Sequence, residues 1–218
     1  MVENQPVLIQ YAVFFLKAAG ITLGISVLSL LVGSIVGFGF SLLRISKQRA
    51  FSALTFAYAE IFRGTPILVQ LFLVYFGLPI VFHINVSAFT TVSVSMILYT
   101  AGYMTEIFRA AIQAVDRGQW DAAYTIGMTY TQALFKIIVP QAMRIAVPPT
   151  LGQFISVLKD SSLASIIGFM ELTKAGMAVR AATSSTLLAF TIVTCLYFAI
   201  CYSLSVASWR VELRLKKA

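Results

Sequence analysis

The chain has 218 residues, of which 59% are hydrophobic and only 11% are charged, and its mean hydropathy is +0.89. This apolar content is far above that of ordinary soluble domains, so the composition excludes a water-soluble globular protein and indicates an integral membrane protein. The formal net charge of +8 does not indicate nucleic-acid binding, because the basic residues do not form one accessible stripe.

Long uncharged runs predict membrane-spanning helices. Three runs, Ala18–Leu43, Gly64–Thr105 and Ala181–Trp209, each reach the ~20 residues that a helix needs to cross the hydrocarbon core. The middle run is long enough for two crossings, and Pro79, with the polar residues just beyond it, is expected to break it. Helices are the expected form because unpaired backbone groups are costly in lipid, and the sequence lacks the alternating pattern of a barrel.

An amphipathic lead-in, Pro6–Ala19, is expected to lie near the outer interface before the first crossing. Within that crossing, Gly33 and Gly37 are four residues apart and give one helix face a smooth surface for close contact. Packing inside one subunit and a dimer motif both explain this pair, and packing inside the subunit is favoured.

The second crossing is expected to open at Phe51 and to kink or end at Gly64-Thr65-Pro66, because proline forces the preceding residue out of helical geometry. Just before this point, Glu60 and Arg63 lie on one helix face and are expected to form an ion pair. An anchor at the membrane interface and direct contact with a ligand explain the pair equally well.

The third crossing ends in Leu98–Ala114, where Glu106 and Arg109 are a second expected ion pair. The fourth crossing region, Ile145–Met170, is uninterrupted except for Lys159-Asp160. With the last uncharged run, the chain is expected to make about five crossings.

Five crossings fix the orientation through the positive-inside bias. Only Lys17, Lys174 and Arg180 would lie on the outer side. The N-terminus is therefore expected outside and the C-terminus in the cytoplasm, and residues 1–218 are expected to form a single all-α membrane domain. The basic residues on the cytoplasmic side would be Arg44, Lys47, Arg49, Arg109, Arg117, Lys136, Arg144, Arg210, Arg214, Lys216 and Lys217.

A polar loop, residues 115–142, lies between the third and fourth crossings on the expected cytoplasmic side. Two short helical patterns, Gln119–Ile126 and Thr131–Val139, are separated by Gly127, and Pro140 is expected to stop the second helix. The sequence thus predicts a small, rigid two-helix protrusion, which is suited to docking a partner.

This protrusion resembles the EAA loop of permease subunits in bacterial ATP-binding-cassette importers. Asp121-Ala122-Ala123, Gly127, Ile137 and the pair Val139-Pro140 match the spacing of that motif, with Asp121 in place of the usual glutamate and Val139 in place of leucine. Further segments make the chain similar to the polar amino acid uptake branch, the histidine, glutamine, arginine and cystine type. These segments are Arg63–Gln70, Glu106–Ile112 and Lys159–Leu163.

The resemblance implies a multi-pass permease of the bacterial cytoplasmic (inner) membrane that imports a polar amino acid. Its implied partners are the lipid bilayer, two nucleotide-binding ATPase subunits, a second permease subunit that is a copy or a paralogue, and a soluble extracytoplasmic amino-acid-binding protein. The loop would seat in a cleft of the ATPase. The residues implied in that contact are Gly118, Asp121, Ala122, Ala123, Gly127, Ile137 and Pro140.

The chain is not expected to be an enzyme or to bind a cofactor. It contains no Gly-x-x-x-x-Gly-Lys-Ser/Thr phosphate loop, so the energy for transport would come from another polypeptide or from an ion gradient. A membrane enzyme would need a nucleophile with an adjacent base, or metal ligands, and His83, Cys195 and Cys201 provide neither. An autonomous carrier is the other alternative, although five spans without a repeat enclose little unless the chain forms a homodimer.

Lys159 lies about fourteen residues, or ~21 Å along a helix, into the fourth crossing region, beyond snorkelling reach of the cytoplasmic end. Ionisable residues at such depth usually face a bundle interior or a wet cavity. The alternative is a structural role, in which Lys159 and Asp160 neutralise one another or pair with Arg63 or Glu106. The residues expected to line a pathway for a zwitterionic amino acid are Thr65, Gln70, Lys159, Asp160, Ser161 and Ser162.

Overall fold

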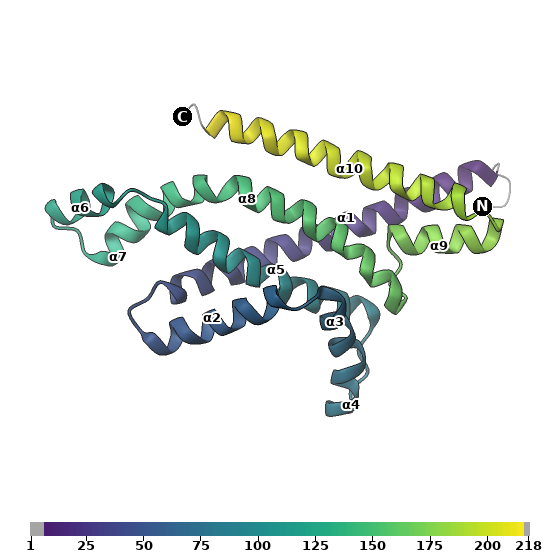
Figure 1. The fold of residues 1–218 in the computed structure, drawn as a ribbon, viewed down its shortest axis with the longest axis horizontal. Coiled ribbons are helices and arrows are strands. Elements are labelled where there is room, and N and C mark those ends of the chain that lie inside the picture. The colour runs from purple at the N-terminus through teal and green to yellow at the C-terminus, as the bar shows by residue number, and fades with distance from the viewer. Residues whose placement is uncertain (1–6, 216–218) are drawn as a thin grey trace.

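The computed structural model describes residues 7–215, and the chain is helical over nearly all of this range (Figure 1). The α-helices of the described residues are α1 (Val7–Arg44), α2 (Arg49–Gly64), α3 (Ile67–Phe72), α4 (Leu78–Phe82), α5 (Ala88–Gln113), α6 (Arg117–Thr125), α7 (Tyr130–Ala133), α8 (Val139–Asp160), α9 (Leu172–Thr183) and α10 (Thr186–Leu215). Two wide π-type turns, η1 (Leu73–Gly77) and η2 (Leu134–Ile138), and one 3-10 segment, η3 (Ser161–Ile167), join some of these helices. The all-α expectation is confirmed for the described residues.

The long helices α1, α5, α8 and α10 run along the length of the molecule, with α6 and α7 at one end and α9 towards the other (Figure 1). α5 is the central helix, because it packs extensively against α1 and also against α8 and α2. α10 packs on α8 and α9 and leaves most of its surface exposed. α3 and α4 point away from the long bundle (Figure 1).

α1 and α5 approach closely where Gly33 and Gly37 face α5. A Cβ added at Gly37 would lie 2.6 Å from the Met104 Cβ and 2.9 Å from the backbone nitrogen of Thr105. A Cβ added at Gly33 would lie 2.8 Å from the Thr100 Cβ. Side chains do not pack this closely, so both positions need glycine. The prediction that this pair packs inside one subunit is confirmed.

α1 is one continuous helix from Val7, so the described part of the predicted lead-in continues without a break into the first crossing, and its place near the outer interface stays a prediction. Phe15, Ala18 and Ala19 are buried in one cluster with residues of α9 and α10. No proline or glycine lies between Val7 and Ala19, so nothing in this stretch interrupts the helix. Pro6 lies outside the described residues.

The predicted kink at Gly64-Thr65-Pro66 is confirmed, because α2 and the helix Ile67–Phe82 meet at 102°. Thr65 and Pro66 are both extended, as the steric effect of proline on its predecessor requires. The bend removes the helical partners of the last carbonyls of α2. Gln70 replaces them: its Nε2 donates to the carbonyl of Phe62 at 3.0 Å and to that of Thr65 at 3.1 Å.

The predicted break in the middle uncharged run is present at residues 83–87, but Pro79 does not cause it. Proline lacks an N–H, and its ring clashes with the carbonyl four residues earlier in a regular α-helix. Here the preceding turn is wide, with the Leu78 N–H bonded to the Leu73 carbonyl five residues back. This turn accommodates the ring, so the helix continues to Phe82 and ends at His83, which has a φ of 53°.

Pro140 does not stop its helix either. The wide turn η2 precedes it, and the Val139 N–H bonds to the Leu134 carbonyl, again five residues back. The helix that begins at Tyr130 therefore continues through η2 and α8 to Asp160. The second predicted loop helix is consequently the first part of a long one and not a separate short element.

By length and hydropathy, two described helical stretches could cross a membrane, residues 10–44 and 186–215. The number rises to four when two bent pairs, Arg49–Gly64 with Ile67–Phe82 and Tyr130–Ile167 with Leu172–Thr183, each count as one span. α5 is long enough at 26 residues, but its buried face carries several Ser and Thr hydroxyls, which lower its hydropathy. The fifth crossing therefore stays a prediction.

Replacing Gly37 by Ala should destabilise the protein, because the new Cβ has to displace Met104 and the α5 backbone. Over-packing of this kind costs ~1–3 kcal/mol, which exceeds the ~1 kcal/mol that Ala gains over Gly inside a helix. Gly39→Ala is the matched control, because nothing lies within 4 Å of its added Cβ. Thermal unfolding of the purified protein measures both, and equal melting temperatures for the two variants would contradict the close α1–α5 contact.

Candidate functional site

The turn between α6 and α7 is closed by two backbone hydrogen bonds. The Met128 N–H donates to the Ala123 carbonyl and the Gly127 N–H to the Tyr124 carbonyl, both at 3.0 Å. Gly127 has a φ of 80°, in the left-handed region that favours glycine. This pattern is a Schellman motif, and it confirms the predicted turn at Gly127.

The two helix starts of this region are also capped. The Asp116 side chain accepts the Gly118 N–H at 2.7 Å at the start of α6. At the start of α7, Thr129 and Gln132 form a reciprocal capping box. With both starts and the intervening turn fixed, the α6–α7 hairpin, residues 115–139, is a locally ordered unit.

Apolar packing and one polar contact attach the α6–α7 hairpin to the bundle. Leu134 and Ile138 belong to a buried cluster with Phe108 of α5. On the surface, the Gln141 Nε2 donates to the Gln119 Oε1 at 3.1 Å, which ties the start of α8 to α6. A force on the hairpin would therefore reach α5 and α8 directly.

Most residues predicted to contact an ATPase are on the surface of this hairpin or, for Pro140, at the start of α8. Gly118, Asp121, Ala122, Gly127 and Pro140 are exposed, Ile137 is half-buried, and Ala123 is fully buried. The hairpin also exposes four large apolar or aromatic side chains, Tyr124, Ile126, Tyr130 and Phe135, and Ile126 is 74% exposed. An apolar tip flanked by polar residues is typical of a protein–protein contact surface.

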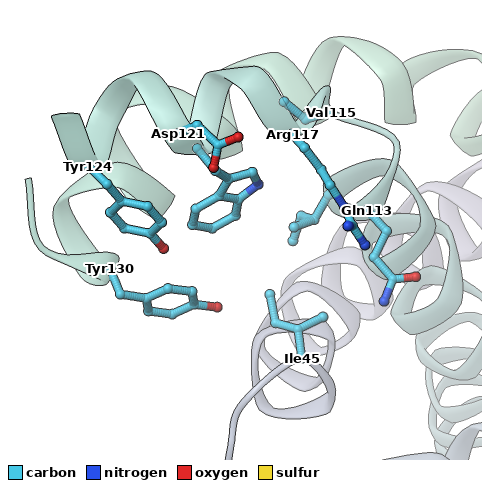
Figure 2. A pocket seen from close by; sticks show the side chains of 9 residues that line it. Ile45, Gln113, Val115, Arg117, Asp121, Tyr124 and Tyr130 are labelled. Carbon is cyan, nitrogen blue, oxygen red and sulfur yellow. The ribbon is translucent and has the colours of Figure 1, made fainter.

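A cavity of about 610 Å³ lies between α6, α7 and the ends of α1 and α5 (Figure 2). The Trp120 ring stacks on Tyr130, with ring centroids 5.4 Å apart and planes at 15°. The ring centroids of Tyr124 and Trp120 are 6.2 Å apart. Asp121 and Arg117 also line the cavity. Partial burial, followed by the nearby Tyr124, raises the pKa of Tyr130 above its ordinary value.

A groove with mostly apolar walls and a few charged side chains, formed by two adjoining cavities, follows one face of α5. The bend cavity, about 380 Å³, lies at the α2–α3 bend and is lined by Thr65 and Tyr99, among others. The α5–α8 cavity, about 470 Å³, is lined by Arg109 and Pro149, among others. Arg63 and Tyr103 line both cavities.

Both predicted ion pairs are confirmed and lie along this groove. The Arg63 Nη1 is 3.6 Å from the Glu60 Oε1. Two nitrogens of Arg109 contact the Glu106 Oε2, at 2.7 Å through Nε and 2.6 Å through Nη2. Arg44, at the end of α1, adds a nitrogen 3.8 Å from the other oxygen of Glu106.

The structure does not bring all the predicted pathway residues together. Lys159 and Ser162 line a third cavity of about 480 Å³ against α10, whereas Asp160 interacts with Tyr99 on the α5 side. Thr65 lines the bend cavity. Ser161 is fully buried and donates to the Leu158 carbonyl at 2.8 Å.

Gln70 is also buried, and its amide group closes the helix end at the α2–α3 bend. The Thr65 hydroxyl belongs to the same helix end, since it donates to the Ile61 carbonyl at 2.8 Å and accepts from the Gln70 Nε2 at 3.0 Å. Of the six predicted pathway residues, Asp160 is therefore the one on the α5 side that does not close a helix end or turn. The roles of all six in a pathway stay predictions.

Glu171 is a fully buried carboxylate that belongs to none of the motifs in the sequence. It accepts the backbone N–H groups of Thr173 at 2.9 Å and Lys174 at 2.7 Å, and the Tyr197 hydroxyl at 2.8 Å. Thr22 of α1 accepts the first N–H of α9 at 3.0 Å. Together these bonds join α9 to α1 and α10. An acid at a helix start is a capping signal, but the sequence pattern gives no sign of its burial.

Comparison with known proteins matches residues 29–217 to the family described as binding-protein-dependent transport system inner membrane component. The L-cystine transport system permease protein TcyB of Bacillus subtilis (strain 168) is 36% identical over 96% of this chain and 91% of its own length. The arginine transport system permease protein ArtQ of the same strain is 34% identical over 93% of both chains.

Two solved structures have a similar fold. The crystal structure of an amino acid ABC transporter with histidines contains a chain that is 32% identical, with a TM-score of 0.89 and full coverage of both chains. A chain of the MetNI methionine ABC transporter in an inward-facing conformation has a TM-score of 0.79 at 17% identity, covering 93% of this chain and 96% of its own. This second likeness concerns the fold alone.

Replacing Gly127 by Ala should loosen the α6–α7 hairpin, because a Cβ at φ 80° costs ~1–2 kcal/mol. Gly127→Asn is the matched control, since asparagine tolerates the left-handed region and should destabilise the hairpin less than alanine does. Hydrogen–deuterium exchange of the amides of residues 117–134 measures the local opening. If the Ala and Asn variants exchanged alike and as slowly as the native protein, the Schellman turn would not be what orders the hairpin.

Proposed function

Because this chain belongs to the family of binding-protein-dependent transport system inner membrane components, we propose that it is the permease subunit of an ATP-driven importer for a polar amino acid. The family places it in the inner membrane, and its relatives include permeases for L-cystine and arginine. The observation that carries the proposal is the ordered α6–α7 hairpin with its exposed Asp121 and apolar tip, within a chain matched over nearly its full length.

The chain crosses the membrane five times in this proposal: by α1, by α2 with α3 and α4, by α5, by α8 with η3 and α9, and by α10. Its N-terminus is outside and its C-terminus is in the cytoplasm. The basic residues at the ends of α1, α5 and α10 support this orientation, because such residues favour the cytoplasmic side. The α6–α7 hairpin then lies in the cytoplasm.

The α6–α7 hairpin is the EAA-type coupling loop and docks on a separate ATPase subunit. Ile126 and Phe135 supply apolar contact area, and Asp121 supplies a negative charge for a basic residue of the partner. The chain has no phosphate-binding loop of its own, so ATP is bound and hydrolysed by that partner. The continuous helix from Tyr130 to Asp160 carries the motion of the loop into the membrane.

The working unit contains two permease subunits, which are two copies of this chain or this chain with a paralogue, and two ATPase subunits. ATP binding draws the ATPase subunits together, moves the two coupling loops and turns the pathway from inward-facing to outward-facing. A soluble binding protein then releases its amino acid into the pathway, and hydrolysis resets the cycle. Asp160, on the α5 side with Tyr99, is the expected partner of the solute's ammonium group.

Replacing Asp121 by Lys should weaken the permease–ATPase complex at least tenfold, because it places a positive charge where a basic partner residue is expected. Lys47→Glu is the control, since it also changes the charge by two at an exposed site outside the hairpin. Co-purification of the ATPase and ATP-dependent uptake measure the loss. An Asp121 variant that retained both would refute the proposed docking surface.

Replacing Asp160 by Asn should lower uptake at least tenfold while leaving the ATPase bound, because the solute's ammonium loses its anionic partner. The measurement is uptake of radiolabelled L-cystine, L-arginine, L-glutamine and L-histidine by cells that express the whole transport system. Native uptake by this variant would remove Asp160 from the pathway. Uptake that persisted with an inactivated ATPase would favour an ion-gradient carrier instead.

A further inference from the structure

Arg63 stands at the junction of the bend cavity and the α5–α8 cavity. Its side chain lines both, as does that of Tyr103. The two cavities, of about 380 Å³ and 470 Å³, each lie within the roughly 300–1,000 Å³ typical of small-molecule sites. A solute that moves from one cavity to the other along α5 must pass this guanidinium.

The fold holds Arg63 at this point through close contact between α2 and α5. The Tyr58 hydroxyl donates to the Leu98 carbonyl at 2.7 Å, which fixes α2 against α5. Gly102 lets α2 approach α5 closely next to Arg63, because a Cβ added there would lie 3.1 Å from the Phe62 Cβ. The guanidinium carbon lies 5.6 Å from the centre of the Tyr103 ring, in cation–π range.

Positive charge predominates along this groove. Glu106 contacts two cations, Arg109 and Arg44, so its own charge is compensated. Glu60, the ion-pair partner of Arg63, is 3.6 Å away and its side chain is 56% exposed. An exposed pair at this distance is weak, so Arg63 remains able to exchange partners.

We propose that Arg63 binds the carboxylate of the transported amino acid at the junction of the two cavities, and that Glu60 competes for the same guanidinium and so promotes release. The inference rests on the proposed function and adds a specificity residue to it. The planar guanidinium can receive a carboxylate through two parallel hydrogen bonds, which an ammonium cannot reproduce. A transport site must also release what it binds, and a nearby competing acid provides for that.

A role as an interfacial anchor fits this geometry less well. Arg63 lies about fourteen residues beyond Arg49, or ~21 Å along α2, which is far from the helix end with the basic cluster. An anchor would direct its charge towards water or lipid headgroups at the interface. Arg63 instead lies over Tyr103 and faces two cavities.

The test uses the purified permease–ATPase complex in lipid nanodiscs, without nucleotide and without the binding protein. Equilibrium binding is measured for the radiolabelled L-amino acid that the uptake assay identifies, in competition with the amine that lacks its carboxylate, for example agmatine for L-arginine. Arg63→Gln should raise the Kd at least tenfold and abolish discrimination against the amine. Arg63→Lys should lie between this variant and the native protein, because it keeps the charge but loses the paired donors.

Glu60→Gln should act in the opposite direction. Without the competing carboxylate, the Kd should fall severalfold and turnover in uptake should slow, because release becomes harder. Arg49→Gln removes an exposed arginine of the same helix outside the groove and should change neither quantity. Thermal unfolding and ATPase co-purification check that each variant is folded.

Unchanged affinity and unchanged discrimination in Arg63→Gln would overturn the inference. If that variant failed to fold, an unchanged Kd in Glu60→Gln or a native Kd in Arg63→Lys would overturn it instead. A native complex that transports an amino acid but does not bind it without the binding protein would also overturn it. Failure of the native system to take up any amino acid would instead count against the proposed function.

Discussion

Hydrogen bonds from the chain's own side chains close two of the helix interruptions in the described residues, and the rest of the structure depends on this. A bilayer offers no water for free backbone groups, so an open bend is costly there. At the α2–α3 bend, the Gln70 amide donates to the carbonyls that have lost their helical partners. At the start of α9, the Glu171 carboxylate accepts the free backbone N–H groups. Because these bonds satisfy the backbone, irregular segments can lie beside cavities without destabilising the bundle.

α5 and α8 connect the hairpin to the groove. α5 leads from the groove into α6, and the helix from Tyr130 to Asp160 leads back from α7. The α5–α8 cavity, the Glu106–Arg109 pair and the apolar cluster beneath the hairpin therefore all involve these two helices. Movement of the hairpin cannot leave the groove unchanged unless one of these helices bends. The wide turn η2, at the base of the hairpin, is the point at which α8 departs from regular geometry.

The sequence correctly predicted the bends and turns that are determined by residues adjacent in the chain. Proline geometry predicted the bend at Pro66, and the glycine at position 127 predicted the loop turn. It mispredicted Pro79 and Pro140, because a wide turn before a proline depends on packing that a single-sequence pattern does not contain. It grouped Lys159 with Asp160, and the two charges do interact, but Lys159 also lines the cavity against α10 whereas Asp160 lies near Tyr99 of α5, since neighbouring residues on a helix point in different directions.

The intrinsic fluorescence of Trp120, which stacks on Tyr130, can be used to monitor the hairpin. The chain has two tryptophans, Trp120 and Trp209, and only Trp120 belongs to the hairpin and stacks on Tyr130. Indole fluorescence responds to its surroundings, and here they consist of aromatic rings at the surface proposed to meet the ATPase. With Trp209 exchanged for Phe, the emission of an otherwise unlabelled transporter would follow engagement of the motor subunit in real time.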